Sequence, residues 1–503
     1  MQDPGAPRAR RLPPLELIVF VVGSSTLGAE IAAARLMAPF FGASTVVWAN
    51  TIAVVLVALA VGYWFGGRMA DRRPDQAALS LLVLVAAALL ALVPIVSQPF
   101  LSLSVSAFDD LSLGAGFGSL LGVLALVAIP VLMLGAVSPW AIRLKLESIE
   151  DSGETAGRMY AISTVGSLLG TFLSALLLIP LAGTQRTFLT FALALALVAA
   201  VGLPRRWWLV PLGIAALFAV PVGTVKAAED GKVIHETDTT YQYARVIDHP
   251  NGDRTLELNE GQAIHSLYRR GSVLTGGYWD GYLVTPFSTR PDPPRRIAIL
   301  GFAGGTVARA YARYFPSTII DGVEIDGELF DIGRRYFGLK PRPQLREHTE
   351  DARPFLRATN ARYDSIFLDT YRQPYIPFYL STREFFELVR ERLAPGGSVI
   401  VNLGHPEGHD ELEKVITETM ESAFDHVVRD PIKPTNTLLI GSQSTPTAAN
   451  LRAARLPEAL RPLALASADR LSPPLKGGAV YTDDRAPVEW LIDKSIVEYA
   501  AGG

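Results

Sequence analysis

The stretch IAILGFAGGTVARAYARYFPSTIIDGVEID, residues 297–326, decides how the C-terminal half of the chain is interpreted. An apolar run typical of a β-strand leads into a turn with Gly301, Gly304 and Gly305, then a helical pattern, then a second strand-like run that ends on Glu324. Glycines allow the backbone to approach a ligand where a Cβ would clash. An acid at the tip of the second strand is suited to accept hydrogen bonds from a ribose diol. The stretch predicts a β-α-β unit that binds a nucleoside, the alternative being a packed turn without a ligand.

Strand-like and helical segments continue to alternate after this stretch, as far as about residue 402. Such alternation predicts a mostly parallel sheet with helices on both faces, an α/β Rossmann-like fold of the S-adenosylmethionine-dependent transferase type over residues 291–503. Ligands of such sheets bind at the carboxyl ends of the strands. Gly301, Glu324, Asp351 and Asp369 all fall at predicted strand ends on that edge. We therefore expect these four residues to line one pocket.

Residues 226–290 precede this domain and show the period-two alternation of β-strands. The dipeptide Asn251-Gly252 lies between two such runs and is a strong hairpin signal. The segment predicts a small β-hairpin module that covers the nucleoside site as a flap.

Residues 1–225 are far more apolar than the rest of the chain. The whole protein is 49% hydrophobic and 19% charged, with a mean hydropathy of +0.27, which is too apolar for an ordinary soluble enzyme of 503 residues. The apolar runs are long enough to cross a bilayer core of about 30 Å. They predict a multi-pass α-helical membrane domain with about seven spans, at residues 15–37, 46–65, 77–96, 117–137, 160–181, 187–202 and 208–222.

Arginine and lysine residues are concentrated in alternate connections between the predicted spans, which places the N-terminus in the cytoplasm. Seven full crossings would then put the C-terminal half outside, although nucleoside cofactors are cytosolic. Either one weak segment does not cross, or the catalytic half faces outward; substrate supply favours the cytosolic side of the cell membrane. Glu30 lies inside the first span, where a carboxylate is costly. It is a candidate for transport or ligand binding, the alternative being a bond to a neighbouring helix.

Composition excludes several other classes of function. The chain has no cysteine, which excludes disulfides, thiolate catalysis and cysteine-ligated metal. A net charge of −3 gives no indication of nucleic-acid binding. The histidines lack the spacing of a metal site, so no metal is expected.

The soluble half resembles the polyamine aminopropyltransferases, or spermidine synthases, from about residue 236 to residue 442. The whole chain resembles the membrane-bound, transporter-fused branch of that family. No single matching segment is specific for this family, but the order and spacing of the segments together are. The matching pieces are Tyr241-Gln242, LNEGQ at 258–262, Tyr278-Trp279-Asp280, residues 301–306, 323–326, 350–352 and 368–369, and Ile376-Pro377.

The resemblance implies transfer of an aminopropyl group from a decarboxylated S-adenosylmethionine-type donor to putrescine or another amine, with release of methylthioadenosine. It also implies a role for each matching residue. Glu324 would hold the ribose hydroxyls and Asp351 the adenine amino group, and Gln242 and Gln262 would close the site from the flap. Gly301, Gly304 and Ala352 would also belong to the cofactor site. Asp369 would take a proton from the incoming amine, since a protonated amine is no nucleophile. Tyr278, Asp280, Tyr371 and Arg372 would line the acceptor site. A homodimer remains open.

More ordinary roles are open for the same residues. Asp351 could cap the helix that follows it, Asp369 could be a loop acid, and Tyr278 could serve packing. The chain also departs from the family pattern at two positions. Gly304 stands where the family has the acid that binds the donor ammonium, and Arg372 stands where soluble members have a second acid.

These departures favour a donor that keeps its carboxylate, and they leave two alternatives open. One is an S-adenosylmethionine-using enzyme of another type, either a methyltransferase or a cyclising or eliminating lyase. The other is a non-catalytic polyamine transporter or sensor.

Overall fold

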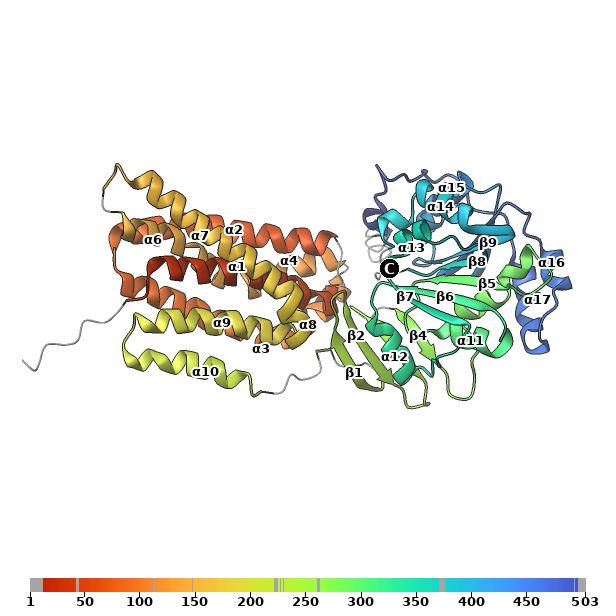
Figure 1. The fold of residues 1–503 in the computed structure, drawn as a ribbon, viewed down its shortest axis with the longest axis horizontal. Coiled ribbons are helices and arrows are strands. Elements are labelled where there is room, and N and C mark those ends of the chain that lie inside the picture. The colour runs from red at the N-terminus through yellow and green to blue at the C-terminus, as the bar shows by residue number, and fades with distance from the viewer. Residues whose placement is uncertain are drawn as a thin grey trace, which may run out of the picture. The chain divides into compact units, whose positions relative to one another are not determined.

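The computed structural model describes residues 12–41, 45–111, 114–146, 148–220, 225–226, 228, 230–259, 263–370, 376–492 and 494–495, with the side chains of 102–116 left aside. The chain divides into two compact units (Figure 1). The first, helical unit comprises Met1–Lys226 and Thr237–Gln242. The second, which contains the residues expected to be catalytic and is called the catalytic unit for that reason, comprises Ala227–Glu236 and Tyr243–Gly503.

The helical unit contains six helices that are long and apolar enough to cross a membrane, counted over the described residues. The helices that form them are α1 (Leu15–Phe41), α2 (Thr45–Arg72), α3 (Gln76–Leu111), α5 with α6 (Ala128–Gly135 and Val137–Lys145), α7 with a π turn and α8 (Ser152–Leu173, Ser174–Leu178 and Ile179–Ala182), and α9 (Thr184–Val201). Helix α4 (Gly114–Leu126) precedes α5.

The seventh predicted span is shorter than expected. Its helix, α10 (Leu209–Leu217), has nine residues and follows a 3₁₀ turn, Arg205–Trp208. At about 1.5 Å per residue it covers roughly 14 Å, about half of a bilayer core.

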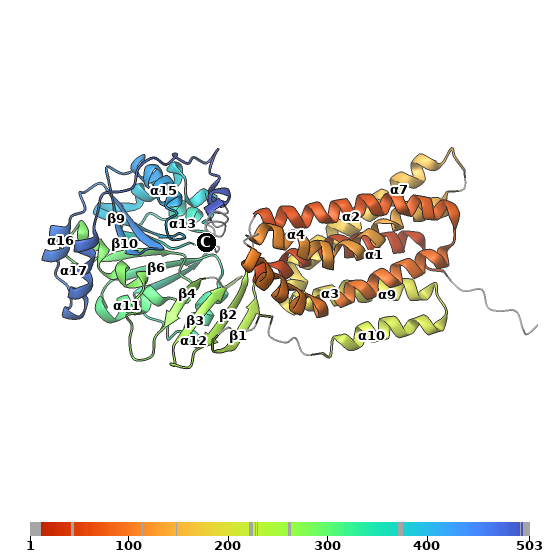
Figure 2. The same ribbon diagram turned by 180° about the vertical axis from the view of Figure 1, so that it is seen from behind.

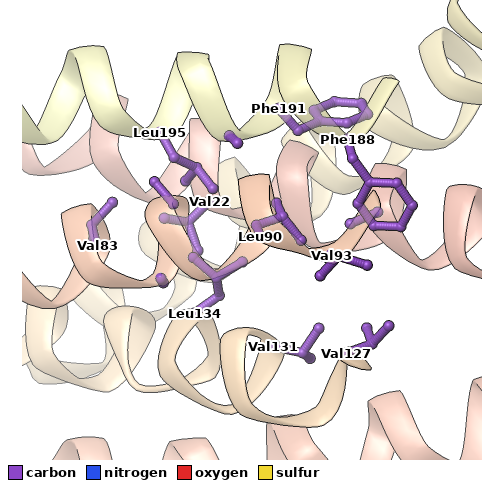
Figure 3. Packing of buried hydrophobic residues seen from close by; sticks show 14 of the residues in the cluster. Val22, Val83, Leu90, Val93, Val127, Val131, Leu134, Phe188, Phe191 and Leu195 are labelled. Carbon is purple, nitrogen blue, oxygen red and sulfur yellow. The ribbon is translucent and has the colours of Figure 1, made fainter. Parts of the chain in front are cut away.

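Close backbone packing holds α1 against α7. A Cβ on Gly166 or Gly170 would overlap the carbonyl oxygens of Phe20 and Ser24, so only glycine fits at these crossings. The interior of the unit is apolar: Val22, Leu90, Leu134 and Leu195 come from four different helices and lie together (Figure 3).

Glu30 is only half-buried in α1. It forms no hydrogen bond or ion pair with the part of the chain that the structure describes, so the bond to a neighbouring helix is not seen there.

The catalytic unit begins with a four-stranded sheet. Its strands are β1 (Lys232–Asp238), β2 (Tyr243–Asp248), β3 (Arg254–Leu258) and β4 (Ile264–Tyr268), in that order. Strands β2 and β3 pair antiparallel, as do β3 and β4. The predicted hairpin joins β2 to β3, and Gly252 supplies the positive φ of +81° that its turn requires.

A mixed seven-stranded sheet follows, in the order β10-β11-β9-β8-β5-β6-β7. The strands are β5 (Arg296–Leu300), β6 (Ile319–Glu324), β7 (Leu345–Thr349), β8 (Tyr363–Leu368), β9 (Leu393–Gly404), β10 (His426–Lys433) and β11 (Asn436–Ser442). The five strands from β9 to β7 are parallel, which confirms the Rossmann-like prediction. The last two strands are antiparallel, which the β/α alternation did not predict.

Alternate side chains of these strands point to opposite faces of the sheet and belong to two hydrophobic cores. Leu300, Val323 and Leu368 pack with α13 (Ala352–Ala358), α14 (Arg383–Arg392) and α15 (Glu411–Glu421). Ile299, Ile320 and Phe367 pack with α11 (Thr306–Tyr314), α16 (Ala448–Ala453) and α17 (Arg461–Arg470). The views in Figures 1 and 2 accordingly show helices on both faces of the sheet, with α13 on one face and α11 on the other. The remaining helix, α12 (Glu328–Tyr336), follows β6 and packs against the four-stranded sheet.

Candidate active site

The glycine turn after β5 brings two strand ends into contact. Gly301 has a φ of +83°, and a Cβ there would overlap the carbonyl oxygen of Asp369. The Asp369 amide in turn donates to the Leu300 carbonyl at 2.9 Å. Because β6 lies on one side of β5 and β8 on the other, this is the point where the strand order reverses, where open α/β sheets bind ligands.

Glu324, the last residue of β6, is buried against the same turn. Its two carboxylate oxygens accept hydrogen bonds from the amides of Ala303 at 2.9 Å and Asp326 at 3.2 Å. Burial raises the pKa of Glu324 to about 7, although the hydrogen bonds from these amides oppose the shift. A ligand that donates hydroxyl hydrogen bonds or brings positive charge therefore favours the ionised carboxylate.

Asp351 follows β7 and caps helix α13, as the simpler interpretation of the sequence proposed. One carboxylate oxygen accepts from the Arg353 amide at 2.8 Å. The other accepts from the Tyr379 hydroxyl at 2.5 Å, a partner that the sequence did not reveal. A carboxylate has about four acceptor sites, so Asp351 can still accept a bond from an amino group.

Asp369 follows β8 and is held by two side chains. The Tyr278 hydroxyl lies 3.1 Å from one oxygen, and the Asn402 amide donates to the other at 2.9 Å. Asn436 donates to the Asn402 oxygen at 2.8 Å and fixes its orientation. Burial raises the pKa of Asp369 to about 6, and the Asn402 and Tyr278 bonds limit the rise. At neutral pH this side chain is mostly a carboxylate that can accept a proton.

Asn402 and Asn436 were not predicted as site residues. Asn402 lies on β9 close to the edge that carries the acids, and Asn436 begins β11. The available signal was an amide side chain in an otherwise apolar strand, which is uncommon unless it has a partner.

Two predicted site residues have other contacts. The Asp280 carboxylate accepts three bonds from its own loop, from the Thr275 amide and hydroxyl and from the Gly276 amide. Gln242 belongs to the segment Thr237–Gln242, which packs with the helical unit. Gln262, Tyr371 and Arg372 lie outside the described residues, and Ala352 is the buried first residue of α13.

Gly304 lies against the four-stranded sheet. Its amide donates to the Ser266 hydroxyl at 2.8 Å. A Cβ at this position would lie 3.0 Å from that oxygen and 3.1 Å from the Ser266 Cβ. An acidic side chain therefore does not fit here unless Ser266 moves.

The strand register brings these groups to one edge. Leu300 pairs with both Val323 and Leu368, and Glu324 pairs with Thr349. The ends of β5, β6, β7 and β8 are thus neighbours, and each carries one of the four predicted pocket residues. Within the described ranges, no group of three or more His, Asp or Glu side chains is arranged to hold a metal ion.

Comparison with known proteins agrees with this arrangement. Residues 284–445 match the spermine/spermidine synthase domain. The chain is 32% identical over 293 residues to a probable polyamine aminopropyl transferase of Bifidobacterium longum, covering 53% of this chain and 64% of the relative. It is 33% identical over 187 residues to a polyamine aminopropyltransferase of Vibrio vulnificus, covering 34% of this chain and 58% of the relative. The chain thus spans about three fifths of the length of these relatives.

Among solved structures, a probable spermidine synthase from Corynebacterium glutamicum covers 50% of this chain and 98% of its own, at 22% identity and a TM-score of 0.36. The family match, the two relatives and the order of the motifs agree: residues 284–445 match the spermine/spermidine synthase domain, and this part of the chain is similar to polyamine aminopropyltransferases.

Proposed function

We propose that this chain is a membrane-anchored polyamine aminopropyltransferase. It transfers an aminopropyl group from decarboxylated S-adenosylmethionine to an amine, with putrescine as the expected acceptor and spermidine as the product. The observation that carries the proposal is the buried Asp369, held by Tyr278 and Asn402 directly beside the glycine turn. The relatives named polyamine aminopropyltransferase support the same reaction type.

In this mechanism each acid has one task. Glu324 accepts hydrogen bonds from the ribose hydroxyls, and Asp351 accepts one from the adenine amino group. Asp369 removes a proton from the acceptor ammonium, which frees the nitrogen lone pair. That nitrogen forms a bond to the carbon beside the sulfonium, the carbon–sulfur bond breaks, and its electron pair leaves with neutral methylthioadenosine. Carboxylates around the site also favour a cationic acceptor and a cationic sulfur.

The crowding at Gly304 favours one second candidate. None of residues 301–306 is acidic, so the glycine turn offers no carboxylate to bind the ammonium of the donor, and Ser266 lies against the space beside Gly304. A donor that keeps its carboxylate would not need that acid. The second candidate is therefore an enzyme that uses intact S-adenosylmethionine, either a methyltransferase or a lyase that releases methylthioadenosine.

Product analysis distinguishes these candidates. The full chain in detergent is incubated with decarboxylated or intact donor, with and without putrescine. Methylthioadenosine and spermidine in equal amounts, formed only with the decarboxylated donor and putrescine, support the transferase. S-adenosylhomocysteine, or methylthioadenosine formed without an acceptor, supports the second candidate. Binding of donor without any product contradicts both.

We also propose that the helical unit spans a membrane with its N-terminus in the cytoplasm. The catalytic half is placed on the cytosolic side, where S-adenosyl donors are made. The short helix α10 supports this placement, because six full crossings return a chain to the side on which it started.

The packing of one segment favours the other arrangement, in which the catalytic half lies outside the cytoplasm. The segment Thr237–Gln242 packs at the helix ends away from the arginine-rich connections, where Arg35 donates to the Thr239 carbonyl at 2.9 Å and Thr184 donates to Asp238 at 2.9 Å.

Single cysteines decide between the two arrangements, since the chain has none of its own. Gly153→Cys reports on the exposed first turn of α7, and Ala459→Cys reports on an exposed turn of the catalytic unit. If both cysteine positions are cytosolic, a membrane-impermeant maleimide labels neither of them in intact cells and labels both after permeabilisation. Labelling of Ala459→Cys alone in intact cells places the catalytic half outside.

A further inference from the structure

A cavity of about 320 Å³ lies in the catalytic unit between α11, the segment 338–342 and the start of β7. Its floor is apolar and includes Ala308, Ile320, Leu339 and Leu345. Glu324, Asp351 and Asp369 do not line it, so it is separate from the candidate active site. Its volume is near the lower limit for small-molecule sites in proteins, about 300 Å³.

Four cationic side chains surround this floor and no carboxylate does: Arg309, Arg313, Lys340 and Arg342. None of the four forms an ion pair with any residue that the structure describes. Arg313 and Lys340 are exposed and form no hydrogen bond within that same part of the chain. Four like charges around one small cavity repel each other. An anion that entered would relieve this repulsion.

Arg309 is the most deeply placed of the four. Its guanidinium donates to the carbonyls of Phe337 at 2.9 Å and Ser272 at 3.1 Å, and it lies 4.6 Å from the centre of the Tyr268 ring. Its Nε is buried and has no acceptor among the described residues. Burial also lowers the pKa of Arg309, which shows that its charge has lost solvation. A buried donor without a partner is costly, so a bound anion would stabilise this side chain.

We propose that this cavity binds a small organic phosphate, with the phosphate groups at the cationic rim and an apolar or aromatic part on the floor. Arg313 has no partner among the described residues, so its planar guanidinium fork can bind two phosphate oxygens. Arg309 and Arg342 already donate to protein oxygens, and they contribute positive charge and their remaining N–H groups. Two sources supply this chemistry: a soluble nucleotide, or the headgroup of an anionic phospholipid.

The test measures binding by the full chain in a zwitterionic detergent, by titration calorimetry. Saturating methylthioadenosine is present throughout, so that the donor site is occupied. The probes are inorganic pyrophosphate, uridine diphosphate and dihexanoyl phosphatidic acid below its micelle concentration. Binding of uridine diphosphate identifies a soluble ligand, and binding of phosphatidic acid alone identifies a lipid headgroup. Absence of binding by all three probes overturns the proposal.

Matched variants locate the binding. Arg313→Gln with Lys340→Gln removes the two exposed rim charges and should weaken binding of the active probe at least tenfold. Arg362→Gln with Arg461→Gln removes two exposed arginine charges elsewhere on the catalytic unit and should leave affinity within twofold. Equal weakening by both pairs would mean a general charge effect and would overturn the proposal.

Ala312→Glu gives an independent check. It keeps every cation but places a carboxylate at the cavity wall, and it should also weaken binding at least tenfold. Each variant must keep the wild-type melting temperature within about 2 °C, and unchanged affinity in a folded Ala312→Glu variant rejects the site.

Discussion

Asp369→Asn tests the proposed reaction most directly. The substitution keeps the shape of the side chain but removes the charge and the proton-accepting oxygen. The asparagine oxygen can still accept from the Asn402 amide, which donates to Asp369 at 2.9 Å, and the Tyr278 hydroxyl can rotate to accept instead of donate. Loss of a general base costs about 10²- to 10⁴-fold in rate, which corresponds to about 2.7 to 5.5 kcal/mol in the activation barrier. We expect a loss of turnover in this range.

The pH profile adds a second readout. The pKa of Asp369 is raised to about 6 by burial. The measurement is made with saturating donor, which keeps Glu324 ionised, so that kcat reports Asp369. Below pH 6 the Asp369 side chain is protonated and cannot accept the ammonium proton, so kcat should fall about tenfold per pH unit. Above about pH 7 the carboxylate is formed and this dependence should level off. In Asp369→Asn the acidic limb near pH 6 should disappear.

The assay is the release of methylthioadenosine, followed by chromatography, with decarboxylated donor and putrescine. Binding of methylthioadenosine to the same variant is measured by calorimetry and should be unchanged, because Glu324 and Asp351 are intact. Asp331→Asn is the matched control: this exposed acid on α12 pairs with Arg334 and lies outside the site. Turnover of Asp369→Asn within threefold of the wild type, or an unchanged acidic limb, would refute the assignment of Asp369 as the base.

Three further substitutions test the surroundings. Asn402→Ala removes a bond that lowers the pKa of Asp369, so the acidic limb should move to higher pH; a lower rate with an unmoved limb would indicate a purely structural effect. Tyr379→Phe removes the 2.5 Å bond to Asp351 and should weaken methylthioadenosine binding about tenfold by calorimetry, since bonds to charged groups contribute about 1.5–3 kcal/mol. Unchanged affinity would show that the Tyr379 bond does not position Asp351 for the donor. Gly304→Ala places a Cβ 3.0 Å from a serine hydroxyl on β4; it should cost about 1–3 kcal/mol, seen as a lower melting temperature, and an unchanged value would contradict the crowding.

The sequence alone determined the order of the elements and the edge of the sheet that carries the acids. Strand-like runs separated by helical ones require parallel strands, and parallel strands present their carboxyl ends together. Glu324, Asp351 and Asp369 could therefore be assigned to neighbouring strand ends from their local context. The long apolar runs likewise predicted the helices of the N-terminal half. A run of apolar residues can be recognised in the sequence without knowing which other segment it contacts.

Only the tertiary structure decided which groups these acids contact. Asn402 lies 33 residues from Asp369, and Tyr379 lies 28 residues from Asp351. Such partners depend on the register of separate strands and loops, which no local pattern fixes. Asp280 matched the family motif, but its carboxylate accepts hydrogen bonds from the backbone amides of its own loop.

The crowding of Gly304 by Ser266 has the same origin. Ser266 belongs to β4, a strand of a different sheet, and the two meet only because packing brings that sheet against the glycine turn. A sequence lists the chemical groups and the periodicity that builds each element. Contacts between distant elements follow from burial of the whole core, so they are known only when the chain is folded.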